Sequence, residues 1–124
     1  MNTQEVANRL IQLCREGKNL QAIDELYGEN IISKEPKGTP MELIEGKDDV
    51  KSKTVDWENM VEELHSASIS EALVAEDFFT VVMDMDVTYK GMGRMAMSEI
   101  AVYEVKDGKI VAEEFFYKVP VMAN

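Results

Sequence analysis

The chain has 124 residues, of which 45% are hydrophobic and 30% are charged, and its formal net charge is -11 at pH 7. This length allows one domain with one hydrophobic core, and the composition is ordinary for a soluble globular chain. The acidic balance argues against nucleic acid and anionic membranes as partners, because both are bound through clustered Lys and Arg.

Cysteine content and the N-terminus indicate the compartment. Cys14 is the single cysteine, so no internal disulfide can form, which suits a reducing environment. The first residues show no basic-then-apolar leader, and no apolar run reaches membrane-spanning length. We therefore expect a cytoplasmic protein with one domain over residues 1–124.

The first half of the sequence predicts two helices in succession. Asn2 or Thr3 can cap a first helix that Gly17 ends, and Asn19 can cap a second helix that Gly28 ends. Both segments place apolar residues at the spacing of one helical face. Each helix is therefore expected to cover a core with one side.

A short strand and a third helix follow. Residues 30–35 are predicted as a strand that Pro36 closes, because proline lacks the amide that a central strand needs. The third helix begins after Gly46. One of its faces carries Val50, Thr54, Trp57, Val61 and Leu64, at spacings of three, four and seven residues.

The second half predicts four long strands joined by turns. Met83 to Tyr89 alternates strictly between apolar and polar residues, which is the period of a strand with one dry face. Glycine-bearing loops at 91–93 and 106–108 are typical of hairpins, with Gly93 and Gly108 in the left-handed conformation. The strands are expected over residues 65–75, 78–90, 94–105 and 109–119.

The hairpin loops predict a register in which Met85 faces Glu99 and Glu99 faces Phe115. The opposite sheet face is mixed, which suits partial burial in an oligomer, and it leaves Asp84 and Asp86 without a predicted partner. The first face is apolar with a few isolated acids and carries these residues: Val81, Met83, Met85, Val87, Met95, Met97, Glu99, Ala101, Tyr103, Glu113, Phe115 and Tyr117.

The order of these elements resembles the nuclear-transport-factor-2-like cone fold, and the chain is similar to its SnoaL-like and ketosteroid-isomerase-like branch. The resemblance spans nearly the whole chain. It implies an α+β fold in which three N-terminal helices pack in the concave face of a curved, mostly antiparallel sheet. It also implies a conical pocket open at one end and a homodimer through the outer sheet face. The motifs that carry it are residues 17–27, 35–38, 45–46, 107–111 and 115–117.

The resemblance also implies roles for single residues. Glu35 stands before a proline at the position of the ketosteroid isomerases' general base. Leu10 and Ala101 stand where those enzymes place their oxyanion donors, and neither side chain can donate a hydrogen bond. Steroid isomerisation by the family's known arrangement is therefore not expected, because that chemistry leans on such donors.

The candidate catalytic residues are Glu35, His65 and Glu99. A carboxylate in an apolar pocket has a raised pKa and can shuttle a proton, although Glu35 could also be a solvated residue beside a turn. Alternation puts His65 on the pocket face, and the alternative is a half-exposed residue at a strand end. Glu99 needs a partner in its apolar row. The candidates are Tyr103, Tyr117, His65 and, near the rim, Arg94. Glu113 on the last strand has the same status as Glu99, but a one-residue slip of that strand would turn Glu114 and Phe116 inward instead.

The predicted pocket lining combines thioethers and aromatic rings, which suit an adaptable apolar site. Plain core packing is the alternative for these side chains. One histidine and scattered acids show no metal-ligand spacing, so no metal and no cofactor are expected. The predicted lining residues are Trp57, Met83, Met85, Met97, Ala101, Tyr103, Glu113, Phe115 and Tyr117.

Two functions from different classes remain open at this point. The first is a small acid/base enzyme of isomerase, cyclase or hydrolase type. It would act on an apolar carbonyl-bearing or polycyclic compound, with Glu35 as proton acceptor. The second is a non-catalytic binding module or dimeric interaction domain that holds a hydrophobic ligand. The missing donors at Leu10 and Ala101 favour binding or a different chemistry.

Overall fold

The computed structural model describes residues 1–119 and begins with two helices and a strand. The helices are α1 (Thr3–Arg15), α2 (Asn19–Leu26) and, later in the chain, α3 (Lys47–Met60). Helix α1 begins with a capping box, because Asn2 and Glu5 each accept a hydrogen bond from the other's backbone amide. No helix of the described residues is long and apolar enough to cross a membrane.

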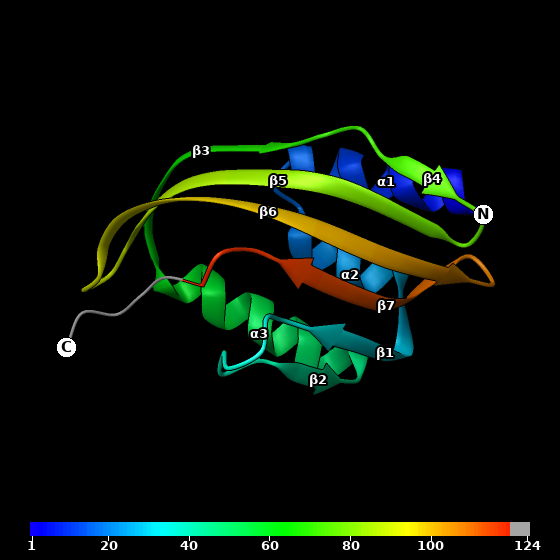
Figure 1. Ribbon diagram of the computed structural model, residues 1–124, viewed down its shortest axis with the longest axis horizontal. Helices are drawn as coiled ribbons and strands as arrows, with labels where there is room; N and C mark the ends of the chain where they lie inside the picture. Colours follow the sequence, from blue (N-terminus) through cyan, green and yellow to red (C-terminus); the bar gives the residue numbers. More distant parts are fainter. Residues whose placement is uncertain (120–124) are drawn as a thin grey trace.

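Seven strands form one curved sheet (Figure 1). Its order is β2-β1-β7-β6-β5-β3, with β4 paired to β5. Every pairing is antiparallel except that of β1 with β7, which is parallel. The strands are β1 (Tyr27–Lys34), β2 (Leu43–Glu45), β3 (Val61–Ile69), β4 (Leu73–Ala75), β5 (Phe78–Tyr89), β6 (Gly93–Lys106) and β7 (Lys109–Phe116).

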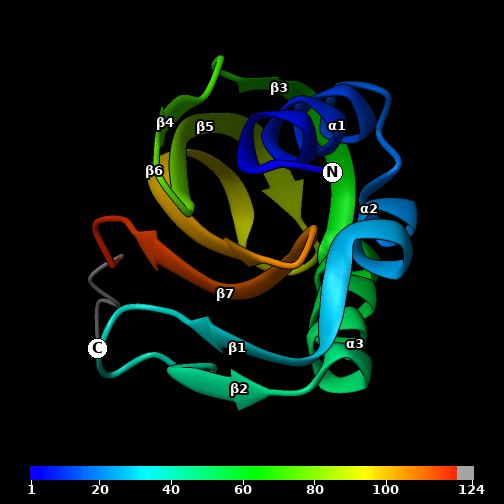
Figure 2. The ribbon, with the colours of Figure 1, turned by 90° about the vertical axis from the view of Figure 1, so that its right-hand side faces the viewer.

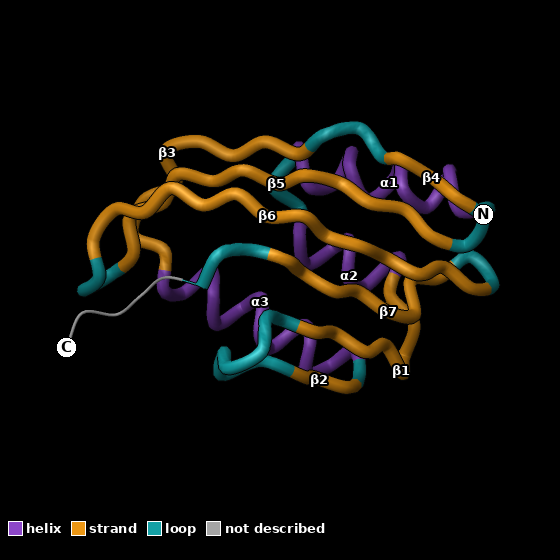
Figure 3. Tube along the Cα trace, in the orientation of Figure 1, coloured by secondary structure: helices purple, strands orange, loops and turns teal. Residues whose placement is uncertain are grey.

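The helices close the concave side of this sheet. Figure 2 shows the strands curving from β3 at the top to β2 at the bottom, with α1, α2 and α3 across the open side. In Figure 3 the tip of the β5–β6 hairpin lies at one end of the molecule and the β6–β7 turn at the other. The predicted α+β cone is therefore confirmed.

The hydrophobic core lies between α1 and the middle of the sheet. Val6 and Leu10 of α1 are buried in one cluster with Val81 of β5. Phe79 and Tyr103 stack with their ring centroids 4.7 Å apart, an arrangement that offset aromatic pairs favour. Burial of these rings fixes β5 and β6 beneath the helices.

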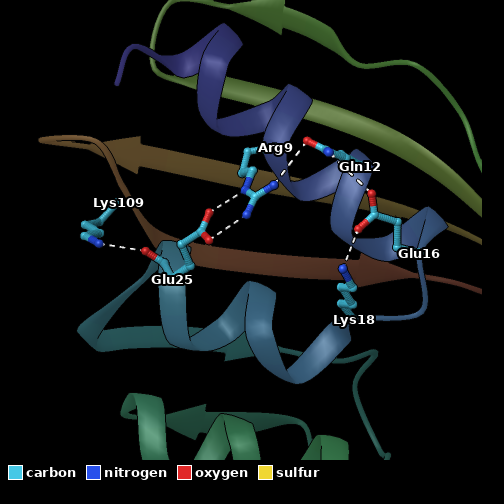
Figure 4. Close-up of polar contacts among 6 residues, drawn as sticks. All are labelled: Arg9, Gln12, Glu16, Lys18, Glu25 and Lys109. Carbon is cyan, nitrogen blue, oxygen red and sulfur yellow. Dashed lines mark hydrogen bonds and ion pairs between the residues drawn. The ribbon is translucent and has the colours of Figure 1, made fainter.

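Charged side chains join α1 to α2 on the solvent side (Figure 4). Arg9 donates two hydrogen bonds to the Glu25 carboxylate, at 2.6 and 2.8 Å. Lys109 donates to the Glu25 backbone oxygen at 2.7 Å, and Lys18 pairs with Glu16 at 3.0 Å. Hydrogen bonding to Arg9 lowers the pKa of the Glu25 carboxyl. The two helices are thereby held side by side.

The predicted hairpin registers are wrong by two residues, although the faces are right. The structure pairs Tyr89 with Gly93, so Met85 faces Met97 in place of Glu99. An even shift leaves every side chain on its predicted face. The φ angle of Gly93 is 85°, in the left-handed region as expected.

The second hairpin reaches the same outcome by another route. Its turn has two residues, Asp107 and Gly108, both with positive φ, which is the preference of a tight hairpin turn. A bulge between Glu104 and Val105 adds the second residue of the shift. Phe115 consequently pairs with Ala101 and not with Glu99, its predicted partner on β6.

The predicted boundary between the third helix and the next strand is also wrong. Helix α3 ends at Met60, and Val61 already pairs with Tyr89 in the sheet. Pairing with β5 thus overrides the helical spacing of Val61 and Leu64. The predicted strand 65–75 is two strands, β3 and β4. Ser70 lies between them and accepts a hydrogen bond from the Val82 amide.

Candidate functional site

A cavity of about 320 Å³ lies between the helices and the concave face of the sheet. Its polar walls carry two carboxylates, one ammonium group and several hydroxyls, and the rest of the surface is mainly apolar. The lining residues are Leu10, Cys14, Asn19, Ala22, Ile23, Tyr27, Glu35, Lys53, Thr54, Trp57, Met83, Met85, Tyr89, Met97, Glu99, Tyr103, Phe115 and Tyr117.

Glu35 reaches the cavity from the end of β1. Its backbone amide donates to the Glu42 carbonyl at 3.2 Å, which fixes the chain where the strand stops. Tyr117, just after β7, donates a hydrogen bond to Glu35 Oε1 at 3.2 Å. The other oxygen, Oε2, is buried without a hydrogen-bond partner among the described residues. Burial raises the pKa of Glu35, while Lys53 and the Tyr117 hydroxyl oppose the rise.

Glu99 is the second carboxylate of the cavity and comes from the middle of β6. Burial above all, together with the nearby charges of Glu35 and Glu113, raises its pKa from the usual 4.5 to about 7. Lys53 opposes this rise. Glu35 and Glu99, which we call the acid pair, therefore share a site in which one proton is readily held near neutral pH.

A chain of hydrogen bonds lies behind the acid pair. Lys53 of α3 donates to Ser33 Oγ at 3.0 Å, and Ser33 donates to Glu113 Oε2 at 2.7 Å. Tyr27 donates a short hydrogen bond to the other oxygen of Glu113. Burial raises the pKa of Glu113, and Lys53 opposes the rise most strongly. We call these four residues the Lys53–Tyr27 network.

The aromatic end of the cavity is also held by hydrogen bonds. Trp57 Nε1 donates to the Tyr89 hydroxyl at 3.0 Å, and that hydroxyl contacts the Met97 sulfur at 3.7 Å. Phe115 lies under the Lys53 ammonium, 5.1 Å from its ring centroid. These contacts set the rings around the cavity in fixed orientations.

Most of the predicted lining residues do meet at this cavity. Glu35 and Glu99 are both in its wall, as are the three methionines Met83, Met85 and Met97. The predicted rings of Trp57, Tyr103, Phe115 and Tyr117 also line it. The sequence thus located one continuous wall, formed by the pocket faces of β5 and β6 and the end of β7.

Three predicted residues do not line the cavity. His65 lies on the other face of the sheet, where its ring contacts Thr88 at 2.7 Å and Glu63 at 3.0 Å. A bulge between Leu64 and Ser66 shifts the register there and breaks the alternation that the prediction assumed. The placement of His65 beside Glu35 is therefore wrong.

The other two residues lie deeper than predicted. Ala101 is on the pocket face but is fully buried in the core, with 0% exposure. Glu113 points inward as predicted, but it is 3% exposed and bonded to Tyr27 and Ser33, so it lies behind the cavity wall. Arg94, a predicted partner for the acid on β6, instead forms a bidentate pair with Asp86.

The sequence reading missed several polar residues of the site. Lys53 lies on the same helical face as Val50, Thr54 and Trp57, so its spacing was a usable signal. Ser33 alternates with Ile31 on the inner side of β1, and both are fully buried. Asn19, expected only as a helix cap, also lines the cavity.

The described residues contain no group of three or more His, Cys, Asp or Glu side chains that could hold a metal ion. Cys14 lines the cavity, but burial raises the pKa of its thiol to about 11. A thiol with such a pKa is a poor nucleophile at neutral pH. The ionisable groups suited to chemistry here are the acid pair and Lys53.

Comparison with known proteins places this cone-shaped α+β domain in a family. The family model of the SnoaL-like domain matches residues 1–117, and the chain belongs to this family. No curated protein matches the sequence.

Solved structures give the same placement. A candidate SnoaL-like polyketide cyclase from Mesorhizobium loti is 33% identical over 94% of this chain and 100% of its own, with a TM-score of 0.89. A candidate isomerase from Bacillus subtilis is 24% identical over 95% and 90% of the two chains, with a TM-score of 0.74. A Catenulispora acidiphila protein with a ketosteroid isomerase-like fold, in complex with trimethylamine, is 18% identical over 94% and 88%, with a TM-score of 0.73.

Proposed function

We propose that this protein is an acid/base enzyme of isomerase or cyclase type, acting on a small, largely apolar carbonyl compound held in the cavity. The observation that carries the proposal is the acid pair, two carboxylates in one apolar cavity with raised pKa values. Carboxyl groups with shifted pKa values that face one cavity are common in sites that transfer protons.

The two acids suit different roles. Burial raises the pKa of Glu35, but Lys53 and the Tyr117 hydroxyl oppose this rise, so we assign Glu35 as the proton acceptor. The pKa of Glu99 is about 7, so near neutral pH a large fraction of Glu99 carries a proton that it can donate. The environments of the acid pair thus separate a base from an acid, as in other two-carboxyl sites.

The reaction step follows from these roles. Glu35 takes a proton from the carbon next to the substrate carbonyl, and the electron pair of that C–H bond moves into an enolate. Glu99 or protonated Glu35 then returns a proton to a carbon of the enolate, which isomerises the substrate. In a cyclase the same enolate carbon attacks a second carbonyl carbon, whose oxygen takes the proton.

Cavity size limits the substrate. Ligand sites of proteins commonly measure about 300–1,000 Å³, so a volume of about 320 Å³ lies at the low end. The lining methionines and rings match an apolar body, and the carboxyls match one or two oxygens. We therefore favour a compact ring compound with a carbonyl group over a large polycycle.

The test measures proton abstraction directly. The protein is incubated with the bicyclic ketone 1-indanone in heavy water, and NMR follows deuterium entering the carbon next to the carbonyl. Loss of a general base typically costs about 10²–10⁴ in rate, so Glu35→Gln should lower the protein-catalysed exchange by at least about 100-fold. Glu99→Gln should leave exchange measurable but slower.

The matched control is Glu58→Gln, which makes the same change at an exposed position of α3. Its exchange rate should equal that of the unmodified protein. Exchange no faster than in protein-free buffer, or equal exchange in the Glu35→Gln variant, would contradict the proposal.

The second candidate function is a non-catalytic binding module. It is favoured by the apolar side chains at the expected donor positions, since Leu10 lines the cavity and Ala101 is fully buried. Native mass spectrometry with 1-indanone separates the two functions. A bound complex without deuterium exchange supports the binding module alone.

We also propose a homodimer through the outer sheet face. Val82, Ile100 and Phe116 are register neighbours across β5, β6 and β7, and they are 41%, 48% and 49% exposed. An apolar row across three strands is a self-complementary surface for a two-fold partner. Sedimentation equilibrium tests this, and a monomer at all concentrations would contradict it.

A further inference from the structure

We propose that the Lys53 ammonium binds the negatively charged oxygen of an enolate in the cavity, and that Ser33 and Glu113 position it. This inference rests on the proposed function for its reaction and deepens it by naming the group that stabilises the intermediate. The substrate class is then a carbonyl compound that passes through an oxygen-centred anion.

Lys53 is the one lysine or arginine among the cavity-lining residues of the described chain. The resemblance placed Leu10 and Ala101 where oxyanion donors would stand, and neither can donate. An enolate formed in an apolar cavity needs a donor or a positive charge beside its oxygen. Lys53 supplies both from a different element, helix α3.

The Lys53–Tyr27 network fixes the position of the Lys53 ammonium group. Ser33 is fully buried and gives its only proton to Glu113, so its oxygen is left to accept from Lys53. The Phe115 ring centroid lies 5.1 Å from the Lys53 ammonium, and the two groups form a cation–π contact. An ammonium group has three donors, and Ser33 occupies one of them.

The surrounding charges define how strongly the site can attract an anion. The carboxyls that interact electrostatically with Lys53 are Glu35 from the end of β1, Glu99 from β6 and Glu113 from β7. The Tyr117 hydroxyl donates a hydrogen bond to Glu35. Glu113 is already paired through Ser33, so the ammonium remains the positive group that a new oxyanion meets.

The test uses 2-naphthol, an apolar two-ring alcohol whose neutral and ionised forms differ in absorption and fluorescence. A site that stabilises an oxyanion binds the naphtholate more tightly than the naphthol, and the bound probe then ionises at lower pH than the free one. For the unmodified protein we expect a preference of at least about tenfold. Lys53→Met should bind naphthol with similar affinity but lose that preference, whereas Lys53→Arg should keep it.

Two further variants separate position from fold. Ser33→Ala keeps the Lys53 charge but removes its hydrogen-bond partner, so it should reduce the preference in part while circular dichroism shows a folded protein. Lys51→Met makes the same charge change on the same helix, where Lys51 pairs with Asp24, and should leave the preference unchanged.

Several results would overturn the inference. They are failure of the unmodified protein to bind the probe, ionisation of the bound probe at the pH seen in water, and a preference that survives in Lys53→Met. Because this readout involves no turnover, it is independent of the deuterium exchange that tests the proposed function. A Lys53-dependent preference without exchange keeps the anion site and rejects the enzyme.

Discussion

Glu99 lies directly opposite Met83 across the β5–β6 ladder, so a carboxyl group is set in a row of apolar side chains. Such a row cannot solvate a charge, and the pKa of Glu99 rises from 4.5 to about 7 for this reason above all. Glu99 therefore lowers the free energy of unfolding when it is ionised, and it can donate a proton when it is protonated.

Replacing Glu99 with glutamine should stabilise the protein in alkaline but not in acidic solution. Between pH 4.5 and about 7 the folded protein holds a proton that the unfolded chain has lost, so the free energy of unfolding falls as pH rises through this window. Glutamine does not ionise, so Glu99→Gln removes this pH-dependent fall in the free energy of unfolding. We expect a gain of about 1–3 kcal/mol above about pH 8, and little gain near about pH 4, from urea unfolding. Equal effects at both pH values would contradict the assignment.

Removing the Tyr117 hydroxyl should move the pH dependence of the reaction. Its hydrogen bond lowers the pKa of Glu35, so Tyr117→Phe should raise that pKa. Glu35 accepts a proton only when ionised, and the acidic limb of the exchange rate should therefore shift to higher pH. Deuterium exchange measured across pH checks this. An unchanged acidic limb, with the rate merely scaled, would show that Tyr117 acts by packing alone.

Glu113 should contribute strongly to the stability of the fold, besides positioning Lys53. Leucine in its place would leave Tyr27 and Ser33 buried without their acceptor, and Lys53 without its counter-charge. Loss of one partner of a buried charged network costs about 3–5 kcal/mol, so Glu113→Leu should lower the free energy of unfolding by that order. Glu113→Gln, which keeps an acceptor oxygen, should cost less, and urea unfolding of both variants checks the ranking.

A charge on the outer sheet face should separate the proposed dimer. Ile100 is 48% exposed and sits between Val82 and Phe116 in the apolar row. Ile100→Glu would place a charge where the two copies meet, and like charges would face each other across a two-fold axis. Sedimentation should show a monomer with unchanged circular dichroism. Glu104→Gln, further along β6, is the control and should remain dimeric.

The fold was predictable because its signals repeat along the chain. Alternation in β5 and β6 identified the pocket face, and the glycine-bearing turns identified the hairpins, even though both registers were wrong by two residues. The cavity side of Glu35 was accessible only through the family resemblance, because nothing local shows where a residue after a strand points.

Bulges and partner choice were beyond the sequence. The bulge before Ser66 places His65 on the outer face. No residue type at that point indicates a bulge. The two carboxyls of β6 and β7 were both predicted inward. Only the packed structure tells that Glu99 faces the cavity and Glu113 is bonded behind it. Lys53 was missed because a lysine on an amphipathic helix is usually read as solvated.

The parallel pairing of β1 with β7 has a consequence for when the site comes into being. Glu35 and Tyr117 are 82 residues apart, and Ser33 and Glu113 are 80 apart, yet both pairs meet only where these two strands join. Closing so long a loop costs conformational entropy. A ribosome-bound chain cannot form these contacts before its last strand emerges. The cavity is therefore complete only after β7 has been synthesised, and a chain truncated before β7 should be inert however well its helices form.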